Sequence, residues 1–198
     1  MTAKSNGQPT IGVKAQNGSV LLSVLPQLSP LADGDSVERI SNITRHIGIS
    51  YSGLGGDFRV LLSKIRKVAS EYRLQYGEDI NVMQAAKAAA AIFQDYTQKG
   101  GVRPFGVSVL IAGWDNYNGN QLYQVETAGT WWKARGGVIG KNHIKGQQFL
   151  EKRLESELQL DDAIHIAIST AKEVSETPIV TDSIHISISC DNGYLVHL

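Results

Sequence analysis

Residues 105–113 alternate between two sets of side chains that are both largely apolar, and this pattern strongly constrains the fold. The two faces of this extended run are Phe105, Val107, Val109 and Ile111, and Gly106, Ser108, Leu110 and Ala112. A strand that is apolar on both faces has to be covered on both faces. The run therefore predicts a sheet buried between two further layers.

Residues 46–52 alternate in a related way, with Ile47, Ile49 and Tyr51 on one face and glycine and serine on the other. A strand with one apolar face and one face of small side chains packs closely against a neighbouring layer. Three glycines at 53, 55 and 56 then end the strand. Their spacing lacks the lysine of a phosphate-binding loop, so a tight connection between a strand and a helix is expected.

A helix follows these glycines, because apolar residues recur at steps of three and four. The positions are Leu54, Phe58, Leu61, Ile65, Val68, Tyr72 and Tyr76. Gly77 is expected to end this helix. Residues 81–84 resemble a capping box, in which Asn81 caps a second helix and Gln84 reaches back. This second helix is rich in alanine and is expected to stop at residues 100–101.

The other elements are predicted from turns, caps and alternation. They are strands at 10–15, 19–24, 36–43, 121–126, 130–134, 136–140, 184–189 and 194–198, and helices at 142–158 and from 160 to about 172. We expect 130–134 and 136–140 to pair with each other, and Asn142 to cap the helix that follows them. Asp161 and Asp162 lie in the first turn of the last helix, where carboxylates suit the helix dipole.

The order of these elements predicts the fold class. Strands, two helices, strands, two helices and strands follow one another, so each helix pair can cover one of two antiparallel sheets that pack face to face. The sequence therefore predicts an α+β fold, a four-layer αββα sandwich. It forms a single domain over residues 10–198 behind a short tail at residues 1–9.

The composition excludes several classes of function. Lys plus Arg and Asp plus Glu each number 19, so the formal net charge is zero and does not favour nucleic-acid binding. No apolar run is long enough to span a membrane. Cys190 is the single cysteine, and the five histidines show no metal-ligand spacing. We therefore expect no disulfide, no metal site and no cofactor.

Two surface patterns leave alternatives open. Arg59, Arg66 and Arg73 recur every seven residues and so share one face of the first helix. This row is either a solvated face or a contact with an acidic neighbour. Trp131 and Trp132 mark either an interface, where tryptophan is enriched, or core packing.

Several stretches resemble one family in the same order along the chain. They are residues 11–15, 17–18, 46–55, 57–61, 94–98, 101–108, 110–115, 140–142, 149–153 and 160–165. Over residues 10–197 the chain resembles the alpha-type subunits of the eukaryotic 20S proteasome. The block Arg103-Pro104-Phe105-Gly106 is quite specific to these subunits.

The resemblance implies the sandwich fold of the N-terminal-nucleophile hydrolases and a non-catalytic, structural role in the 20S core particle. The implied partners are other alpha subunits in a seven-membered ring, beta subunits, and regulatory particles that act as activators. The implied location is cytoplasm and nucleus, and the implied process is ubiquitin-dependent protein catabolism. The family's front helix and C-terminal helix have no counterpart here, so we expect this chain to lack both.

The catalytic beta subunits of the family use an N-terminal threonine, assisted by an aspartate and a lysine. By the resemblance, these three places fall on Gln8, Val24 and Arg39. An amide cannot act as the nucleophile, and arginine stays protonated, so we expect no peptidase activity from this chain. Thr10 is the nearest threonine, but it lies behind Pro9 inside the first predicted strand.

The resemblance also implies one binding site. Pockets between neighbouring alpha subunits receive the C-terminal tails of activators, where a lysine pairs with the tail carboxylate and a Gly-Leu-Gly-like turn supplies backbone donors. These features match Arg39 and the turn Gly53, Leu54 and Gly55. A guanidinium can bind a carboxylate through two parallel hydrogen bonds. The alternative is that Arg39 pairs with Glu38 or Asp35 on the surface.

Two other functions are compatible with the residues. One is a free-standing N-terminal-nucleophile hydrolase that is processed to expose Thr10. The other is a reduced, alpha-like binding module that never enters a ring. Processing would remove residues 1–9, which an intact-mass measurement of the mature chain would detect. The binding module would elute from a size-exclusion column near its own mass.

Overall fold

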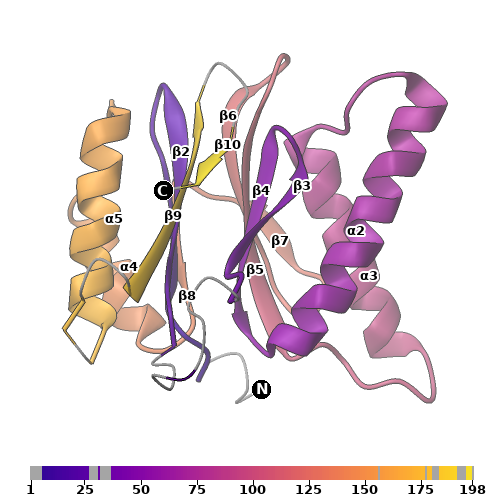
Figure 1. The fold of residues 1–198 in the computed structure, drawn as a ribbon, viewed down its shortest axis with the longest axis horizontal. Helices are drawn as coiled ribbons and strands as arrows, with labels where there is room; N and C mark the ends of the chain where they lie inside the picture. The colour runs from indigo at the N-terminus through magenta and orange to yellow at the C-terminus, as the bar shows by residue number, and fades with distance from the viewer. Residues whose placement is uncertain are drawn as a thin grey trace.

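The computed structural model of this chain describes residues 6–26, 31, 37–155, 157–176, 178–179, 183–190 and 195–197. Within these residues, two five-stranded sheets pack face to face, and helices cover the outer face of each (Figure 1). Every strand pairing is antiparallel. The predicted four-layer αββα sandwich is confirmed.

The first sheet has the strand order β10-β9-β2-β1-β8. Its strands are β1 (Thr10–Lys14), β2 (Gly18–Val24), β8 (Gly136–Ile139), β9 (Ile184–Cys190) and β10 (Leu195–His197). The second sheet has the order β3-β4-β5-β6-β7. Its strands are β3 (Ile40–Thr44), β4 (Ile47–Gly53), β5 (Val107–Asp115), β6 (Gly119–Val125) and β7 (Trp131–Lys133).

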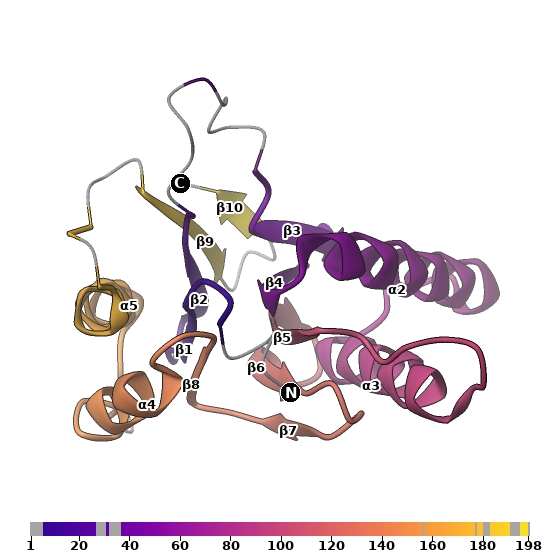
Figure 2. The same cartoon turned by 90° about the horizontal axis from the view of Figure 1, so that it is seen from below.

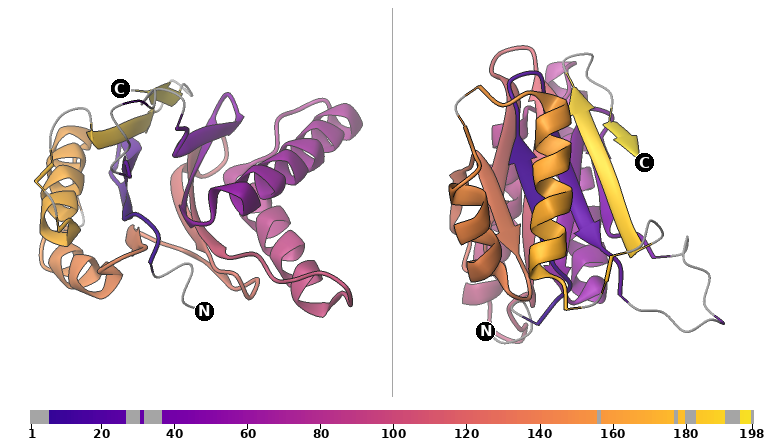
Figure 3. Two further views of the ribbon diagram at one scale, coloured as in Figure 1. Left: turned by 60° about the horizontal axis from the view of Figure 1, so that its bottom comes forward. Right: turned by 90° about the vertical axis from the view of Figure 1, so that its left-hand side faces the viewer.

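The helices α2 (Gly55–Tyr76) and α3 (Val82–Gln98) cover the second sheet, and α4 (His143–Glu151) and α5 (Leu160–Val174) cover the first. Seen from below, the two pairs lie at opposite ends of the molecule with both sheets between them (Figure 2). The side view shows α5 lying lengthwise across the first sheet, beside α4 (Figure 3). Gly77 ends α2 in the left-handed conformation, at a φ of 73°, as its position predicts.

Apolar side chains fill the two outer spaces between each sheet and its helices. Ile49 and Phe93 are fully buried between the second sheet and its helices. Val20 and Ala167 are fully buried between the first sheet and its helices. Burial of these two layers is the main force that holds helices to sheets.

The space between the two sheets holds a smaller apolar cluster and several buried polar side chains. Its apolar cluster consists of Leu21, Ile40, Leu110, Ala112, Leu122 and Ile139. Ser50 and Ser52 of β4 are fully buried, which agrees with close packing of the small face. Gly12 marks the close approach, because a Cβ there would come within 2.9 Å of a Leu122 methyl group.

The predicted pairing of 130–134 with 136–140 is wrong. β7 pairs with β6 in the second sheet, whereas β8 pairs with β1 in the first. The chain crosses between the sheets in two steps: the Ala134 amide donates to the Leu122 carbonyl, and the Lys14 amide donates to the Arg135 carbonyl. Each short strand therefore finds a longer partner strand instead of its neighbour in sequence.

The helix predicted over 142–158 is shorter than expected, and Asn142 holds its N-cap position without the predicted side-chain cap. α4 ends at Glu151, and Asn142 has a positive φ of 56° with no side-chain capping bond. The side-chain amide of Asn142 donates instead to the Val174 carbonyl at the end of α5. This bond ties the start of one helix to the end of the other.

Two other predictions are partly confirmed. Asn81 Oδ1 accepts from the Gln84 amide at 2.8 Å, so the cap of α3 is correct. Gln84 Oε1 has no hydrogen-bond partner among the described residues, and the return half of the capping box is not formed. The strand predicted at 36–43 begins only at Ile40, and residues 32–36 lie outside the described part of the chain.

Asp57 fastens the start of α2 to the segment before β5. Its carboxylate accepts from Arg103 at 2.6 and 2.7 Å and from the Gly106 amide at 2.8 Å. The bond from Arg103 is the main reason that the pKa of Asp57 is lowered, and the Gly106 amide adds to the shift. The ionised carboxylate is therefore stabilised in the folded protein.

We expect Asp57→Asn to lower the free energy of unfolding at neutral pH by on the order of 1 kcal/mol. A carboxyl whose pKa is depressed on folding adds stability above its unfolded pKa and loses it as pH falls through the folded value. The gap between wild type and variant should therefore close in acid. Urea denaturation between pH 7 and pH 2 measures it. Asp95→Asn, which removes an exposed partner of Lys99, is the control and should change stability little.

Candidate functional site

Arg39 is a buried cation at one end of the space between the sheets. The residue is only 4% exposed. Its Nε donates to Ser23 Oγ at 3.2 Å, and its Nη2 donates to the main-chain oxygens of Tyr51 at 3.0 Å and Gln8 at 3.3 Å. Burial lowers the pKa of the guanidinium, and contact with Tyr51 opposes the shift. All three acceptors are neutral, so no described carboxylate balances this charge.

The ring of Tyr51 connects Arg39 to the start of α2. The Arg39 Cζ lies 4.3 Å from the ring centroid, and the Phe58 ring stacks 4.0 Å from the same centroid. Two groups this close to one centroid have to lie on opposite faces of the ring. Tyr51 therefore fills the space between the guanidinium and α2. A Cβ on Gly55 would come 3.0 Å from the Tyr51 hydroxyl, which also places the turn beside this ring.

The turn of Gly53, Leu54 and Gly55 joins the last residue of β4 to the first residue of α2. Gly53 has a φ of 125°, which side chains rarely allow, and a Cβ there would overlap the Gly106 carbonyl oxygen. The Leu54 amide already donates to that same oxygen at 3.1 Å. The Leu54 side chain is 45% exposed. Arg39 and the turn therefore both lie beside Tyr51. The Leu54 side chain of the turn is exposed to solvent, whereas the guanidinium is buried.

The contacts of Arg39 can be compared with the alternative prediction that it pairs with Glu38 or Asp35 on the surface. Glu38 accepts a hydrogen bond from Ser41 at 3.1 Å and is not among the partners of Arg39. Asp35 lies outside the described residues. The prediction that Arg39 and the turn bind an activator tail is not tested by these contacts and stays a prediction.

The three places of the family's catalytic residues do come together. The Gln8 carbonyl accepts from Arg39, and the Val24 amide donates to the Pro9 carbonyl at 3.0 Å. Thr10 is fully buried in β1, and its hydroxyl donates to the Tyr51 carbonyl at 2.9 Å. The positions that correspond to the family's catalytic threonine, aspartate and lysine are thus occupied by main-chain groups of Gln8 and Val24 and by the guanidinium of Arg39. Among the described hydrogen-bond partners of Gln8, Val24 and Arg39, no carboxylate, imidazole or amine is present.

A small cavity of about 50 Å³ lies nearby, between the inner faces of the sheets. Several polar residues line this cavity, and the sequence did not predict that they come together. Glu126 accepts from Ser108 at 3.0 Å and from Gln124 at 2.9 Å, and His143 and Gly140 complete the wall. The pairing of β5 with β6 places Ser108 beside Glu126, and the packing of the two sheets brings Gly140 and His143 to the same cavity, so no local motif reveals the set. The volume suits one or two water molecules.

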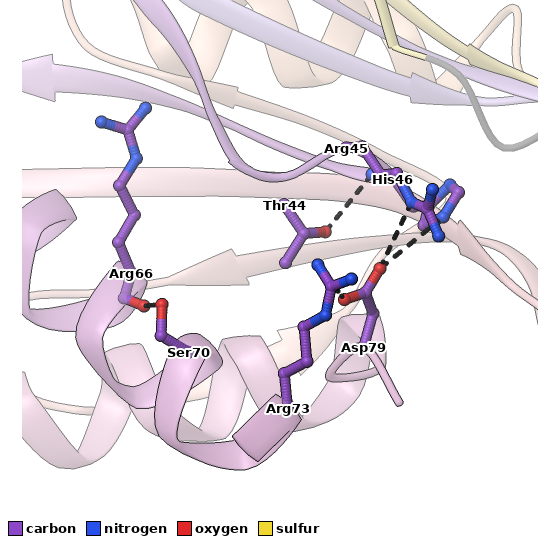
Figure 4. A network of polar contacts seen from close by, with 7 residues as sticks. All are labelled: Thr44, Arg45, His46, Arg66, Ser70, Arg73 and Asp79. Atoms are coloured by element: carbon purple, nitrogen blue, oxygen red, sulfur yellow. Dashed lines mark hydrogen bonds and ion pairs between the residues drawn. The ribbon is translucent and has the colours of Figure 1, made fainter. Parts of the chain in front are cut away.

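A second polar cluster surrounds Asp79 at the other end of α2. Its carboxylate lies 3.5 Å from Arg45, 3.6 Å from Arg73 and 3.8 Å from His46. Figure 4 shows the three side chains converging on it. A cavity of about 260 Å³ opens beside it, and Trp114 is one of its lining residues. The sequence predicted the row that includes Arg73 but not its convergence with Arg45.

The described residues contain no group of three or more His, Cys, Asp or Glu side chains that could hold a metal ion. None of the helices in that part of the chain is long and apolar enough to cross a membrane. Trp131 packs near the Tyr123 ring, at 5.8 Å between centroids, whereas Trp132 is 40% exposed on the edge strand β7. The two tryptophans thus divide between core packing and the surface.

Comparison with known proteins adds independent evidence. A family model described as "Proteasome subunit" matches residues 4–188. A Drosophila melanogaster protein named "Proteasome subunit alpha type-2" is 45% identical over 194 residues, which are 98% of this chain and 82% of the relative.

Relatives from other kingdoms and phyla carry the same name. The protein of Oryza sativa subsp. indica is 47% identical over 188 residues, 95% of this chain and 80% of its own length. The Caenorhabditis elegans protein is 40% identical over 195 residues, 98% of this chain and 83% of its own length. These matches confirm the resemblance to alpha-type proteasome subunits that the motifs predicted, and all three relatives are named alpha type-2.

Proposed function

Because the chain belongs to the proteasome subunit family, we propose that it acts as a non-catalytic, structural subunit in the alpha ring of a 20S core particle. Its partners there are other alpha subunits in a seven-membered ring, the beta subunits beneath it, and the regulatory particles that dock on the ring. It contributes to ring assembly and to the entry of substrates in ubiquitin-dependent protein degradation. It acts in the cytoplasm and the nucleus.

The observation that carries the proposal is the packing around Arg39. The main chain at Gln8 and the Arg39 guanidinium bond to each other where the family's catalytic groups would be. Processing before Thr10 would remove two carbonyl groups that accept hydrogen bonds, from Arg39 and from Val24. This contact network supports a structural role and gives no support to a hydrolase that is processed at Thr10.

Native co-fractionation tests the proposed role. A tagged full-length chain, expressed in cells that assemble proteasomes, should elute from a size-exclusion column with a very large particle. That particle should contain other alpha subunits and beta subunits by mass spectrometry. Elution near the mass of the single chain, with no such subunits, would contradict the proposal and favour a binding module outside the ring.

We propose further that Arg39, Gly53, Leu54 and Gly55 contribute to a pocket for the C-terminal carboxylate of an activator. The buried guanidinium lacks a described anionic partner, so a carboxylate would gain two charge-assisted hydrogen bonds there. The carboxylate has to displace the Gln8 carbonyl to reach Arg39, since the residue is nearly covered. The exposed Leu54 borders the approach.

We expect Arg39→Ala to weaken binding of a synthetic peptide with the sequence of an activator's C-terminal tail at least about tenfold in the assembled ring. The peptide should have a free C-terminus, and its amidated form is the control for carboxylate recognition. Arg39→Lys keeps the charge and should retain part of the affinity. Fluorescence anisotropy measures all three. If the wild type, Arg39→Lys and Arg39→Ala all bound the free-acid peptide with the same affinity, the proposed pocket at Arg39 would be contradicted.

A further inference from the structure

Two β-hairpins carry the dipeptide Asn-Gly in their turns. Asn17-Gly18 lies between β1 and β2, and Asn118-Gly119 lies between β5 and β6. This dipeptide is typical of hairpin turns. It is also the dipeptide in which asparagine most readily loses its side-chain amide, because glycine has no Cβ to shield the main-chain nitrogen that attacks it. The surroundings of the two asparagines therefore decide which of them reacts.

Asn17-Gly18 is held by two other elements of the sandwich. Asn17 Oδ1 accepts a hydrogen bond at 2.9 Å from the main-chain amide of Leu160, the first residue of α5. Gly18 is buried, and a Cβ there would come 2.7 Å from a Leu160 methyl carbon and 2.9 Å from the Ser189 carbonyl oxygen. Closing a five-membered ring between the two residues requires the main chain to change its shape, which these contacts oppose.

Asn118-Gly119 is open to solvent by comparison. Asn118 is exposed, and Gly119 has a φ of 64°, in the left-handed region. A Cβ on Gly119 would meet no atom of the described residues within 4 Å. The main chain at this turn can therefore change its shape without displacing a neighbouring element, and water has access to both residues.

The carboxylate of Asp115 keeps the Asn118 side chain close to the main chain of its own turn. Asp115 Oδ1 accepts from the Asn118 main-chain amide at 2.7 Å and from Asn118 Nδ2 at 3.2 Å. The same oxygen accepts from the Tyr117 main-chain amide at 3.0 Å. Because the bond from Nδ2 is at the long end of the range for hydrogen bonds, the side chain can leave it at little cost.

We propose that Asn118 is a site of spontaneous deamidation, a covalent modification that needs water alone as co-reactant. The Gly119 main-chain nitrogen gives up its proton to solvent and attacks Cγ of Asn118. The new C–N bond closes a five-membered succinimide, while the bond from Cγ to Nδ2 breaks and the amide nitrogen takes up a proton and leaves as ammonia. Water then opens the ring at either carbonyl group, which leaves aspartate or isoaspartate at residue 118.

Either product places a second carboxylate beside Asp115. The nitrogen that donates to Asp115 at 3.2 Å is replaced by a negatively charged oxygen, and two carboxylates this close repel each other. Asp115 Oδ2 also accepts from the buried Gln121 at 3.0 Å, so a change at the turn reaches the interior of the sheet. The reaction therefore loosens the turn between β5 and β6. The site is separate from Arg39 and goes beyond the proposed function.

The rate of deamidation in the folded, full-length chain tests this inference. Asn17 and Asn118 fall in different tryptic peptides, so mass spectrometry can follow each one during storage in a mildly alkaline buffer. We expect Asn118 to deamidate about tenfold faster than Asn17, because the loss of one hydrogen bond changes a population by about that factor. In concentrated urea, where neither turn is formed, the two rates should agree within about twofold.

Asn118→Gln is the control for the position of the reaction, since glutamine has to close a larger ring. The gain of mass in this peptide should disappear in the variant, although Asn116 and Asn120 remain. A gain that persists would place the reaction at another residue and overturn the inference. Equal rates at Asn17 and Asn118 in the folded chain, or no reaction at Asn118, would overturn it as well.

A second experiment measures the consequence of the reaction. Asn118→Asp reproduces one product and should lower the urea concentration at the midpoint of unfolding, because its carboxylate faces Asp115. Asn116→Asp adds the same charge to the same turn and is the matched control, with a smaller expected shift. Equal midpoints for the two variants would contradict the loosening of the turn. Neither experiment requires entry into a ring, so a failure here is distinct from a failure of the proposed role.

Discussion

Gly53→Ala is expected to lower the free energy of unfolding by about 3 kcal/mol or more. The added methyl group would overlap the Gly106 carbonyl oxygen and come within 3.0 Å of the Val107 Cα, and both are main-chain atoms that cannot turn away. The φ of 125° adds backbone strain for any residue with a Cβ. The end of β4 would have to separate from β5, with which Gly53 pairs.

Gly56→Ala is the matched control for this prediction. A Cβ at Gly56 meets no atom within 4 Å, and the residue lies in the first turn of α2. Alanine there should leave stability unchanged or raise it by up to about 1 kcal/mol. Urea and thermal denaturation of the two variants give the comparison. Equal stability of Gly53→Ala and Gly56→Ala would contradict the described junction between β4 and α2.

Arg39→Ala is expected to lower the free energy of unfolding by about 3 kcal/mol. The substitution removes the group that packs on Tyr51 and leaves Ser23 Oγ and the Gln8 carbonyl without the guanidinium donor. The Tyr51 carbonyl loses one of its two donors and keeps the Thr10 hydroxyl. For a chain of this length, the melting temperature should fall by roughly 6–12 °C. Thermal unfolding followed by circular dichroism measures it.

Two further substitutions separate the contributions of packing and hydrogen bonding at this position. Arg39→Met keeps most of the apolar contact with Tyr51 but donates no hydrogen bond, so it should lose less stability than Arg39→Ala. Arg39→Lys keeps the charge with a smaller set of donors and should be more stable than Arg39→Ala. A fully stable Arg39→Ala variant would show that the guanidinium does not hold this end of the sandwich together.

The layered fold could be predicted because its signals are local. The two apolar faces of residues 105–113 required a cover on each side, and the helical stripe that starts at Leu54 supplied part of it. The crossing between β7 and β8 could not be predicted in this way. Two short apolar runs are compatible with a hairpin, and the bonds that separate them involve Leu122 and Lys14, which are distant in sequence.

The helix cap at residue 142 shows a similar limit. Asparagine often caps helices, so Asn142 was a reasonable prediction. The same residue type also tolerates a positive φ, and here its side chain bonds to Val174 from a distant helix. The choice between these two uses depends on a tertiary contact that the local sequence does not contain.

The candidate site was predicted as a set of residues but not as a geometry. Arginine is seldom fully buried, and the sequence left open whether Arg39 lines a binding pocket or pairs with Glu38 or Asp35 on the surface. Its burial depends on acceptors at Gln8, Ser23 and Tyr51, each at least 12 positions away along the chain. The cluster at Asp79 was missed for the same reason, because Arg45 and Arg73 meet only after β3 and α2 pack together.

The most direct measurement of the structural role is the intact mass of this chain, purified from the assembled particle after treatment with a covalent threonine-directed inhibitor. We expect the chain to retain Gln8 and Pro9, with no inhibitor on Thr10, while the catalytic subunits of the same particle are labelled. A chain that begins at Thr10 and carries the inhibitor would contradict a non-catalytic subunit.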